Sequence, residues 1–111
     1  MNELRWTKSE KIVAKRAFEK CCQKACEALL TKLKERIASA DKPSDLWSVH
    51  DFLTEELKEI EYKYDYRYSV LILLFARLLK EGWLQESDLY GIEDDKIEKI
   101  KYLAKDLIKT K

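Results

Sequence analysis

A chain of 111 residues fits one domain, and its 39% charged and 46% hydrophobic residues exclude an intrinsically disordered protein. Only two glycines and one proline, with abundant Lys, Glu, Leu and Ala, are typical of long helices. The net charge of +1 argues against a general nucleic-acid binder, although residues 1–43 carry +5 and residues 44–111 carry −4.

Three cysteines, Cys21, Cys22 and Cys26, lie within six residues of each other. An odd number of cysteines on one predicted helix argues against a secreted disulfide framework. The first residues lack the apolar stretch of a signal peptide, and the most apolar run, 70–75, is far shorter than the roughly 20 residues that span a bilayer. We therefore expect a cytoplasmic protein with reduced thiols.

The first predicted helix runs from about Lys8 to Ala38. Thr7-Lys8-Ser9-Glu10 has the form of a capping box at its start. No glycine or proline follows before Pro43, and the apolar residues recur at helical spacing: Ala14, Phe18, Cys21, Ala25, Leu29 and Leu33. Such a helix is about 45 Å long, so we expect it to pack along its length.

A second helix is predicted from about Asp45 to Lys63. Ser44 is the expected N-cap, with Asp45 in the first turn, where the helix dipole favours negative charge. The apolar stripe again has helical spacing: Leu46, Val49, Leu53, Leu57, Ile60 and Tyr64. Because the connection is short, this helix should run antiparallel to the first, and Leu57 should belong to the core.

The remaining residues predict shorter helices. Residues 63–68 contain no breaker but many weak helix formers, which leaves both a junction and an unbroken helix open. The apolar run 70–75 has no partner strand in the sequence, so a buried helix ending at Gly82 is favoured. One helical turn is expected at 86–91, and acidic residues 93–95 open a last helix with an inner stripe of Ile97, Ile100, Leu103 and Leu107.

These elements predict an all-α fold: two long antiparallel helices followed by a compact pair of helices. Residues 1–111 should form a single helical domain, with a hairpin at about 8–63 and a carboxy-terminal head at about 66–111. A thin hairpin leaves much apolar surface uncovered, so we also expect oligomerisation.

His50, the only histidine, is the one candidate for a general base or a histidine metal ligand. No Cys-x-x-Cys, His-x-x-His or Glu-x-x-His spacing occurs, and the cysteines are expected on the inner stripe of another helix. The sequence thus predicts no catalytic residues, no metal and no cofactor. The cysteines keep two interpretations: packing residues, or a thiol-based redox sensor built on Cys22 and Cys26.

Trp47, His50 and Asp51 are neighbours on one side of the second helix, at positions i, i+3 and i+4. A large aromatic flanked by directional polar groups is typical of a recognition site. The alternative is that Trp47 and His50 pack inward and Asp51 is a solvated charge. Spacing alone leaves both interpretations open.

Several segments occur in a specific order and spacing from residue 45 onward: Asp45-Leu46-Trp47, His50-Asp51-Phe52, Lys63-Tyr64-Asp65, Phe75-Ala76-Arg77-Leu78-Leu79, Glu81-Gly82, Asp95-Lys96 and Lys99-Ile100. In these segments the chain resembles the fluorescence recovery protein family of cyanobacteria. The resemblance implies an all-helical homodimer that binds photoactivated orange carotenoid protein. Binding would speed the return of that partner to its resting form and so restore phycobilisome fluorescence, without covalent catalysis.

The resemblance also implies roles for individual residues. Trp47, His50 and Asp51 match the family's functional strip, and we add Lys58 to the expected partner-binding residues. Leu46 matches a dimer-interface position, and we expect Phe52 and Leu53 beside it.

Two positions depart from the family pattern. Leu57 stands where the family strip carries an arginine, which removes a fixed fork of donors and a permanent charge. Cys21-Cys22 replaces an expected Ala-Tyr pair. An alternative is therefore a related helical dimer that uses the same strip for another protein, in a bacterium without orange carotenoid protein.

Overall fold

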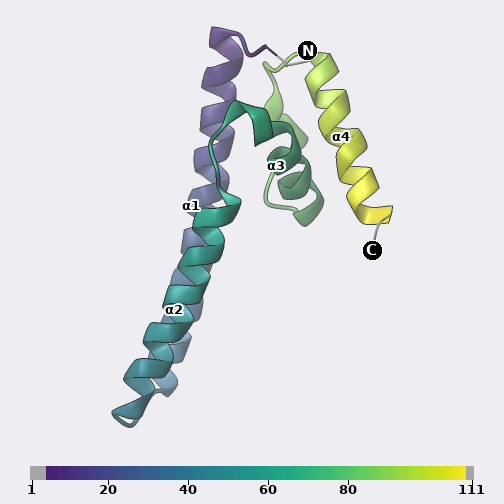
Figure 1. The fold of residues 1–111 in the computed structure, drawn as a ribbon. Coiled ribbons are helices and arrows are strands. Elements are labelled where there is room, and N and C mark those ends of the chain that lie inside the picture. The colour runs from purple at the N-terminus through teal and green to yellow at the C-terminus, as the bar shows by residue number, and fades with distance from the viewer. Residues whose placement is uncertain (1–4, 110–111) are drawn as a thin grey trace. The chain divides into compact units, whose positions relative to one another are not determined.

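The computed structural model describes the backbone of residues 5–109 and the side chains of residues 5–106. The described part contains α1 (Lys8–Ser39), α2 (Ser44–Lys63), α3 (Tyr68–Glu81), the short 3-10 helix η1 (Glu86–Leu89) and α4 (Asp94–Lys109) (Figure 1). Within that part the only β pairing is one isolated bridge between Tyr90 and Ile92. The predicted all-α fold class is confirmed.

The chain divides into two compact units, which we call the hairpin unit (Cys22–Tyr64) and the head unit (Met1–Cys21 with Asp65–Lys111). Helix α1 contributes its first turns to the head unit and its remaining turns to the hairpin unit. The organisation as a single domain stays a prediction.

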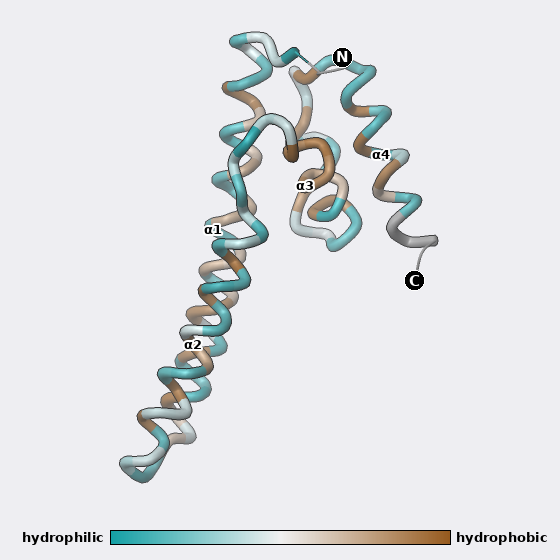
Figure 2. Tube along the Cα trace, viewed as in Figure 1, coloured by the Kyte–Doolittle hydropathy of each residue, from teal (hydrophilic) through white to brown (hydrophobic). Residues whose placement is uncertain are grey.

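Helix α3 forms the centre of the head unit. Its buried residues are Leu71, Ile72, Leu74, Phe75, Ala76 and Leu78, and Figure 2 shows hydrophobic residues gathered along it. The other buried hydrophobic residues of this core come from α1, from the segment between α3 and α4, and from α4: Ala14, Ala17, Cys21, Leu84, Leu89, Ile92, Ile100 and Ala104. The prediction of a buried helix is confirmed, although Leu73 remains 49% exposed. The side chain of Leu107, expected on the inner stripe, lies outside the described residues.

The head unit also contains a buried ion pair at the start of α1. Glu10 accepts a hydrogen bond from the Thr7 amide at 2.9 Å, and the Glu10 amide donates to the Thr7 hydroxyl at 3.1 Å, which confirms the capping box. The Glu10 carboxylate also accepts from the Glu93 amide at 2.9 Å and lies 3.2 Å from Lys96 Nζ at both oxygens. Glu10 is 1% exposed and Lys96 is 3% exposed, so the pair is enclosed.

The Trp6 ring and two amides help to stabilise these charges. Lys96 Nζ lies 5.4 Å from the centre of the Trp6 ring. Burial alone raises the pKa of Glu10, but hydrogen bonds from the Thr7 and Glu93 amides and the Lys96 ammonium outweigh burial, so the pKa lies below its usual value. The carboxylate therefore stays charged inside the head unit.

Helix α2 begins differently from the prediction. Pro43 already has helical angles (φ −55, ψ −34), and no side chain at that position caps the helix. The Asp45 carboxylate instead accepts from the amides of Asp41 at 2.9 Å and Lys42 at 3.2 Å, and these bonds lower its pKa. The prediction of Ser44 as N-cap was wrong, because the turn starts before it and Ser44 is the first helical residue.

Two glycines end turns in the head unit with left-handed backbone angles. Gly82 follows α3 with φ 88, and the amides of Trp83 and Leu84 donate back to the Leu78 carbonyl at 3.0 and 3.2 Å. The predicted end of α3 is thereby confirmed. Gly91 has φ 107, and a Cβ there would lie 2.8 Å from Val13 Cγ2.

These two glycines predict different costs of substitution. Gly91→Ala should lower the free energy of unfolding by about 2–4 kcal/mol, because backbone strain adds to a clash with Val13. Gly82→Ala should cost only about 1–2 kcal/mol, because nothing lies within 4 Å of the added Cβ. Urea unfolding of both variants measures the difference, and equal costs would show that the contact with Val13 relaxes freely.

Candidate functional site

The hairpin unit brings together α1 from Cys22 and the whole of α2. Lys32 Nζ lies 4.0 Å from Glu56, and one turn further along α1 the Arg36 guanidinium lies 4.3 Å from the centre of the Phe52 ring. The second contact lies later in α1 but earlier in α2, so the two helices run in opposite directions. Phe52, expected at a dimer interface, therefore lies against Arg36 of its own chain.

Helix α2 has no fully buried residue. Of its predicted apolar stripe, Val49, Leu53, Ile60 and Tyr64 are half-buried, whereas Leu46 is 68% and Leu57 is 41% exposed. The expectation that Leu57 belongs to the core was wrong for the single chain. Helix α1 offers only one face to α2, and Leu57 lies beyond the edge of that face.

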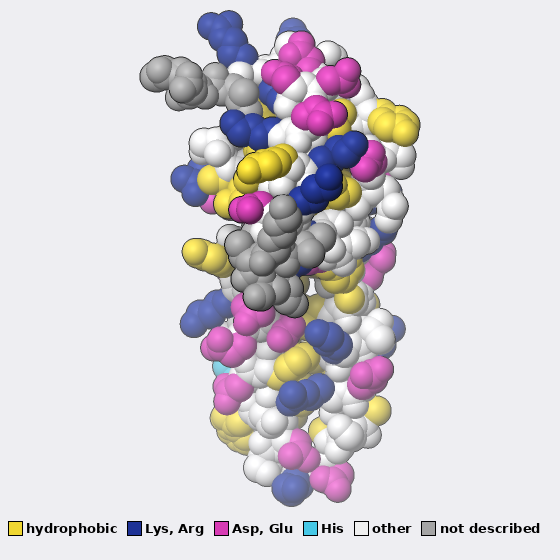
Figure 3. Space-filling view, turned by 90° about the vertical axis from the view of Figure 1, so that its right-hand side faces the viewer, with side chains coloured by type: hydrophobic (Ala, Val, Ile, Leu, Met, Phe, Trp, Pro, Cys, Tyr) yellow, Lys and Arg dark blue, Asp and Glu magenta, His cyan; other side chains and the backbone are white. Residues whose placement is uncertain are grey.

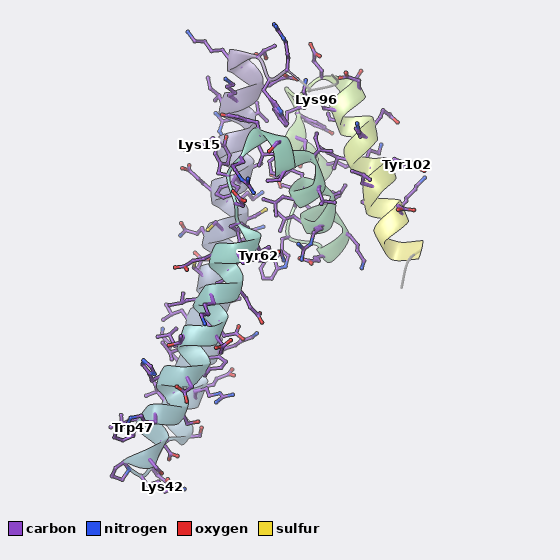
Figure 4. The ribbon with its side chains drawn as sticks, in the orientation of Figure 1. Lys15, Lys42, Trp47, Tyr62, Lys96 and Tyr102 are labelled. Atoms are coloured by element: carbon purple, nitrogen blue, oxygen red, sulfur yellow. The ribbon has the colours of Figure 1, made fainter. Side chains whose placement is uncertain are left out.

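The three residues singled out in the sequence lie together on the open side of α2. Trp47 is 66% exposed, and the side chains of His50 and Asp51 are 73% and 78% exposed, with Nδ1 3.3 Å from Oδ1. Figure 4 shows Trp47 projecting from the hairpin unit near the connection between its helices. None of the three is held in a core, so the structure leaves them available for contact.

Residue spacing divides this surface into two rows. The expected partner-binding residues lie at i, i+3, i+4 and i+11 and form what we call the polar strip: Trp47, His50, Asp51 and Lys58, all exposed. A second row is apolar, with residues seven and four positions apart, as in a coiled-coil seam, and we call Leu46, Leu53 and Leu57 the apolar seam. His50 lies between the two rows, with its Nδ1 3.3 Å from the Asp51 carboxylate.

One exposed residue of this helix was not recognised from the sequence as part of the surface. Tyr62 lies four residues after Lys58 and is 87% exposed, and Figure 4 places it near the far end of α2 from Trp47. Its spacing from Lys58 was the available signal. In the sequence it is one of four tyrosines with period two, at positions 62, 64, 66 and 68, a spacing that spreads the rings over several faces of a helix.

Two of those tyrosines have a different place, in the head unit. Tyr66 meets Phe18 and Tyr68 with ring centres 4.8 and 5.4 Å apart, and Tyr68 meets Trp6 at 5.7 Å. Burial and then the neighbouring Tyr68 hydroxyl raise the pKa of Tyr66. Tyr66 and Tyr68 therefore serve packing between α1 and the start of α3.

The cysteines occupy three different environments. Cys21 is buried in the head unit, where its Sγ donates to the Trp83 carbonyl at 3.3 Å. Cys22 is half-buried and Cys26 is exposed in the hairpin unit. Burial and the adjacent Cys26 thiol raise the pKa of Cys22. Only Cys21 lies on the buried face, so the expectation of an inner position was wrong for Cys26.

The surface of the described residues suits protein recognition. In Figure 3 charged side chains of both signs alternate with hydrophobic ones over the visible face. Among the described residues, no three His, Cys, Asp or Glu side chains are grouped to hold a metal ion, and no described helix is long and apolar enough to cross a membrane. An exposed tryptophan beside polar groups is the arrangement of a contact site.

Comparisons with known proteins agree with one another. A family model described as the photoprotection regulator fluorescence recovery protein matches residues 6–104. The fluorescence recovery protein of Synechocystis sp. is 40% identical over 103 residues, which cover 93% of this chain and 94% of that relative. Solved structures of fluorescence recovery proteins from Fremyella diplosiphon (38% identical) and Synechocystis (40% identical) each match with a TM-score of 0.81, over 91% of this chain and 99% of theirs.

Proposed function

This chain belongs to the fluorescence recovery protein family of photoprotection regulators, and on that basis we propose that it binds photoactivated orange carotenoid protein. Binding accelerates the return of that protein to its resting form and restores phycobilisome fluorescence. The observation that carries the proposal is the exposed polar strip, in which Trp47 is 66% exposed at the position that the resemblance matches to the family's functional strip. The protein acts by binding, as a regulator and not as an enzyme.

The physical basis of such a regulator is a difference in affinity. A protein that binds the compact form of its partner more tightly than the extended form shifts the population toward the compact form. Trp47 supplies a large area that loses contact with water on binding. Asp51 and Lys58 supply charges of opposite sign that select orientation more than they add affinity.

We further propose that a second copy of the chain covers the apolar seam, giving a homodimer through the long helices. Leu46 and Leu57 leave apolar area exposed on a helix that buries no residue fully. Half-buried Leu53 continues the row between them. Leu30 and Ile37 of α1 in the same unit are 50% and 55% exposed and add apolar surface. The dimer acts in the cytosol as one helical domain per chain.

Trp47→Ala is the direct test of the binding proposal. Removing a central aromatic anchor typically costs at least about 2 kcal/mol, so the affinity for photoactivated carotenoid protein should fall about 30-fold or more. The measurement is the rate of dark reversion, followed by absorbance, against the concentration of added protein. Tyr102→Ala, which removes an aromatic 69% exposed on α4, is the matched control and should change the rate little.

Leu57 favours one alternative: the same strip binds a different protein. The missing guanidinium removes a bidentate donor that a family partner would use. A wild-type protein that fails to accelerate reversion even in large excess would reject the carotenoid protein as the partner. The polar strip would then be tested against candidate proteins from the source organism, again with Trp47→Ala as the comparison.

A further inference from the structure

The thiols of Cys22 and Cys26 form a pair that the proposed function does not use. The two residues are one turn apart on α1, a spacing that brings Cβ atoms within about 5–6 Å. Both are free thiols of the hairpin unit, one half-buried and the other exposed, so a small ion can reach them from solvent.

Cys21 does not join this pair, although it is adjacent in sequence. Its side chain is 0% exposed and donates to the Trp83 carbonyl in the head unit. Its neighbour Cys22 therefore points to another side of the helix. The available donor set is two sulfur atoms, with no third cysteine directed toward them.

Two thiols without further ligands select the kind of ion. Structural zinc sites need four ligands, and the described residues hold no group of three or more candidate ligands. Soft thiolate sulfur favours monovalent copper, zinc and iron–sulfur clusters, and of these only the monovalent d10 copper ion accepts two-coordinate, near-linear geometry. Ala25 and Leu29 on this face of α1 are apolar, and the one carboxylate beside them, Glu19, lies 3.9 Å from the Lys15 ammonium.

We propose that Cys22 and Cys26 together bind one monovalent copper ion per chain. Both thiols lose their protons on binding, two Cu–S bonds form, and two protons pass to solvent, so that no electron is transferred. The site is separate from the polar strip, which contains no cysteine. The inference does not depend on the identity of the protein partner.

The test is a titration of the full-length, reduced protein with monovalent copper under anaerobic conditions, against a coloured chelator of that ion. The expected result is one ion per chain, with affinity reduced at least 100-fold in Cys22→Ser and in Cys26→Ser. Cys21→Ser is the matched control and should stay within about threefold of wild type. Because Cys26 is exposed, Cys26→Ser should leave folding intact and gives the decisive comparison.

Several outcomes would overturn the proposal. One is an affinity of Cys26→Ser for copper equal to that of wild type. Another is a loss of copper affinity in Cys21→Ser as large as that in Cys26→Ser. Half an ion per chain would place copper between two copies, and a peroxide-induced disulfide without copper binding would favour the redox sensor. Trp47→Ala should bind copper normally and Cys26→Ser should accelerate carotenoid protein reversion normally, so failure of either proposal is visible without the other.

Discussion

Replacing Lys96 with methionine is expected to lower the free energy of unfolding by about 3–5 kcal/mol, the usual cost of removing one partner from a buried ion pair. The Glu10 carboxylate would remain 1% exposed and would keep only the Thr7 and Glu93 amides as donors. Methionine has nearly the length of lysine and a similar apolar stem, so the lost free energy of unfolding reports the removal of the ammonium charge. Urea unfolding at neutral pH is the measurement.

The matched control adds Glu10→Gln to the Lys96→Met variant. Glutamine carries no charge and keeps a carbonyl oxygen for the two amides, so the double variant should recover at least half of the loss. A cost below about 1 kcal/mol for Lys96→Met alone would mean that water or a shift of α4 satisfies Glu10. In that case the ion pair would not hold the head unit together.

The Glu10–Lys96 ion pair also predicts how the loss of stability in Lys96→Met depends on pH. The pKa of Glu10 in the folded protein lies below its ordinary value of 4.5. The stabilisation is therefore fully present above pH 4.5 and is lost as pH falls through the lower folded value. The stability advantage of wild type over Lys96→Met should therefore be larger at pH 7 than at pH 3, which urea unfolding at the two pH values measures.

The second large effect is expected from Leu46→Arg, through self-association. If a second copy covers the apolar seam, each dimer contains two copies of Leu46 because the interface is symmetric. Losing about 1.5–3 kcal/mol at each leucine would raise the dissociation constant of the dimer about 100-fold or more. Sedimentation equilibrium over a range of concentrations measures the constant.

Two variants separate the position from the charge. Leu46→Ala should weaken the dimer in the same direction but by less, because it removes area without adding a charge. Glu55→Arg adds an arginine outside the seam and should leave the dissociation constant within a few-fold. An unchanged dimer in Leu46→Arg would reject the seam as the interface while leaving the polar strip untouched.

The helices could be predicted because their signals are local. The Thr7–Glu10 cap and Gly82 lie within a few residues of the ends they determine, and the predicted first helix, 8–38, differs from α1 by one residue at its end. The junction before α3 stayed open in the sequence. In the structure Arg67 is extended at φ −122 and donates to the Asp65 carboxylate at 2.9 and 3.0 Å, a local interaction that competes with the helix.

Other features depend on partners far away in the chain. Glu10 was recognised only as a capping residue, because no residue near it in the sequence predicts its ion pair with Lys96, which lies 86 residues later. Leu57 looked like a core residue, because the spacing of apolar residues does not show which of them the neighbouring helix covers. Trp47, His50 and Asp51 were correctly grouped by spacing, but their exposure required the structure.

The head unit is assembled from two stretches of chain with the hairpin unit between them. In this sense the hairpin is an insertion, and during synthesis Glu10 emerges long before the lysine that neutralises it. Long sequence separation slows the formation of such contacts, so completion of the head should be a late event in folding. The same arrangement lets the hairpin change length between relatives by whole helical turns while the residues of the head keep their places.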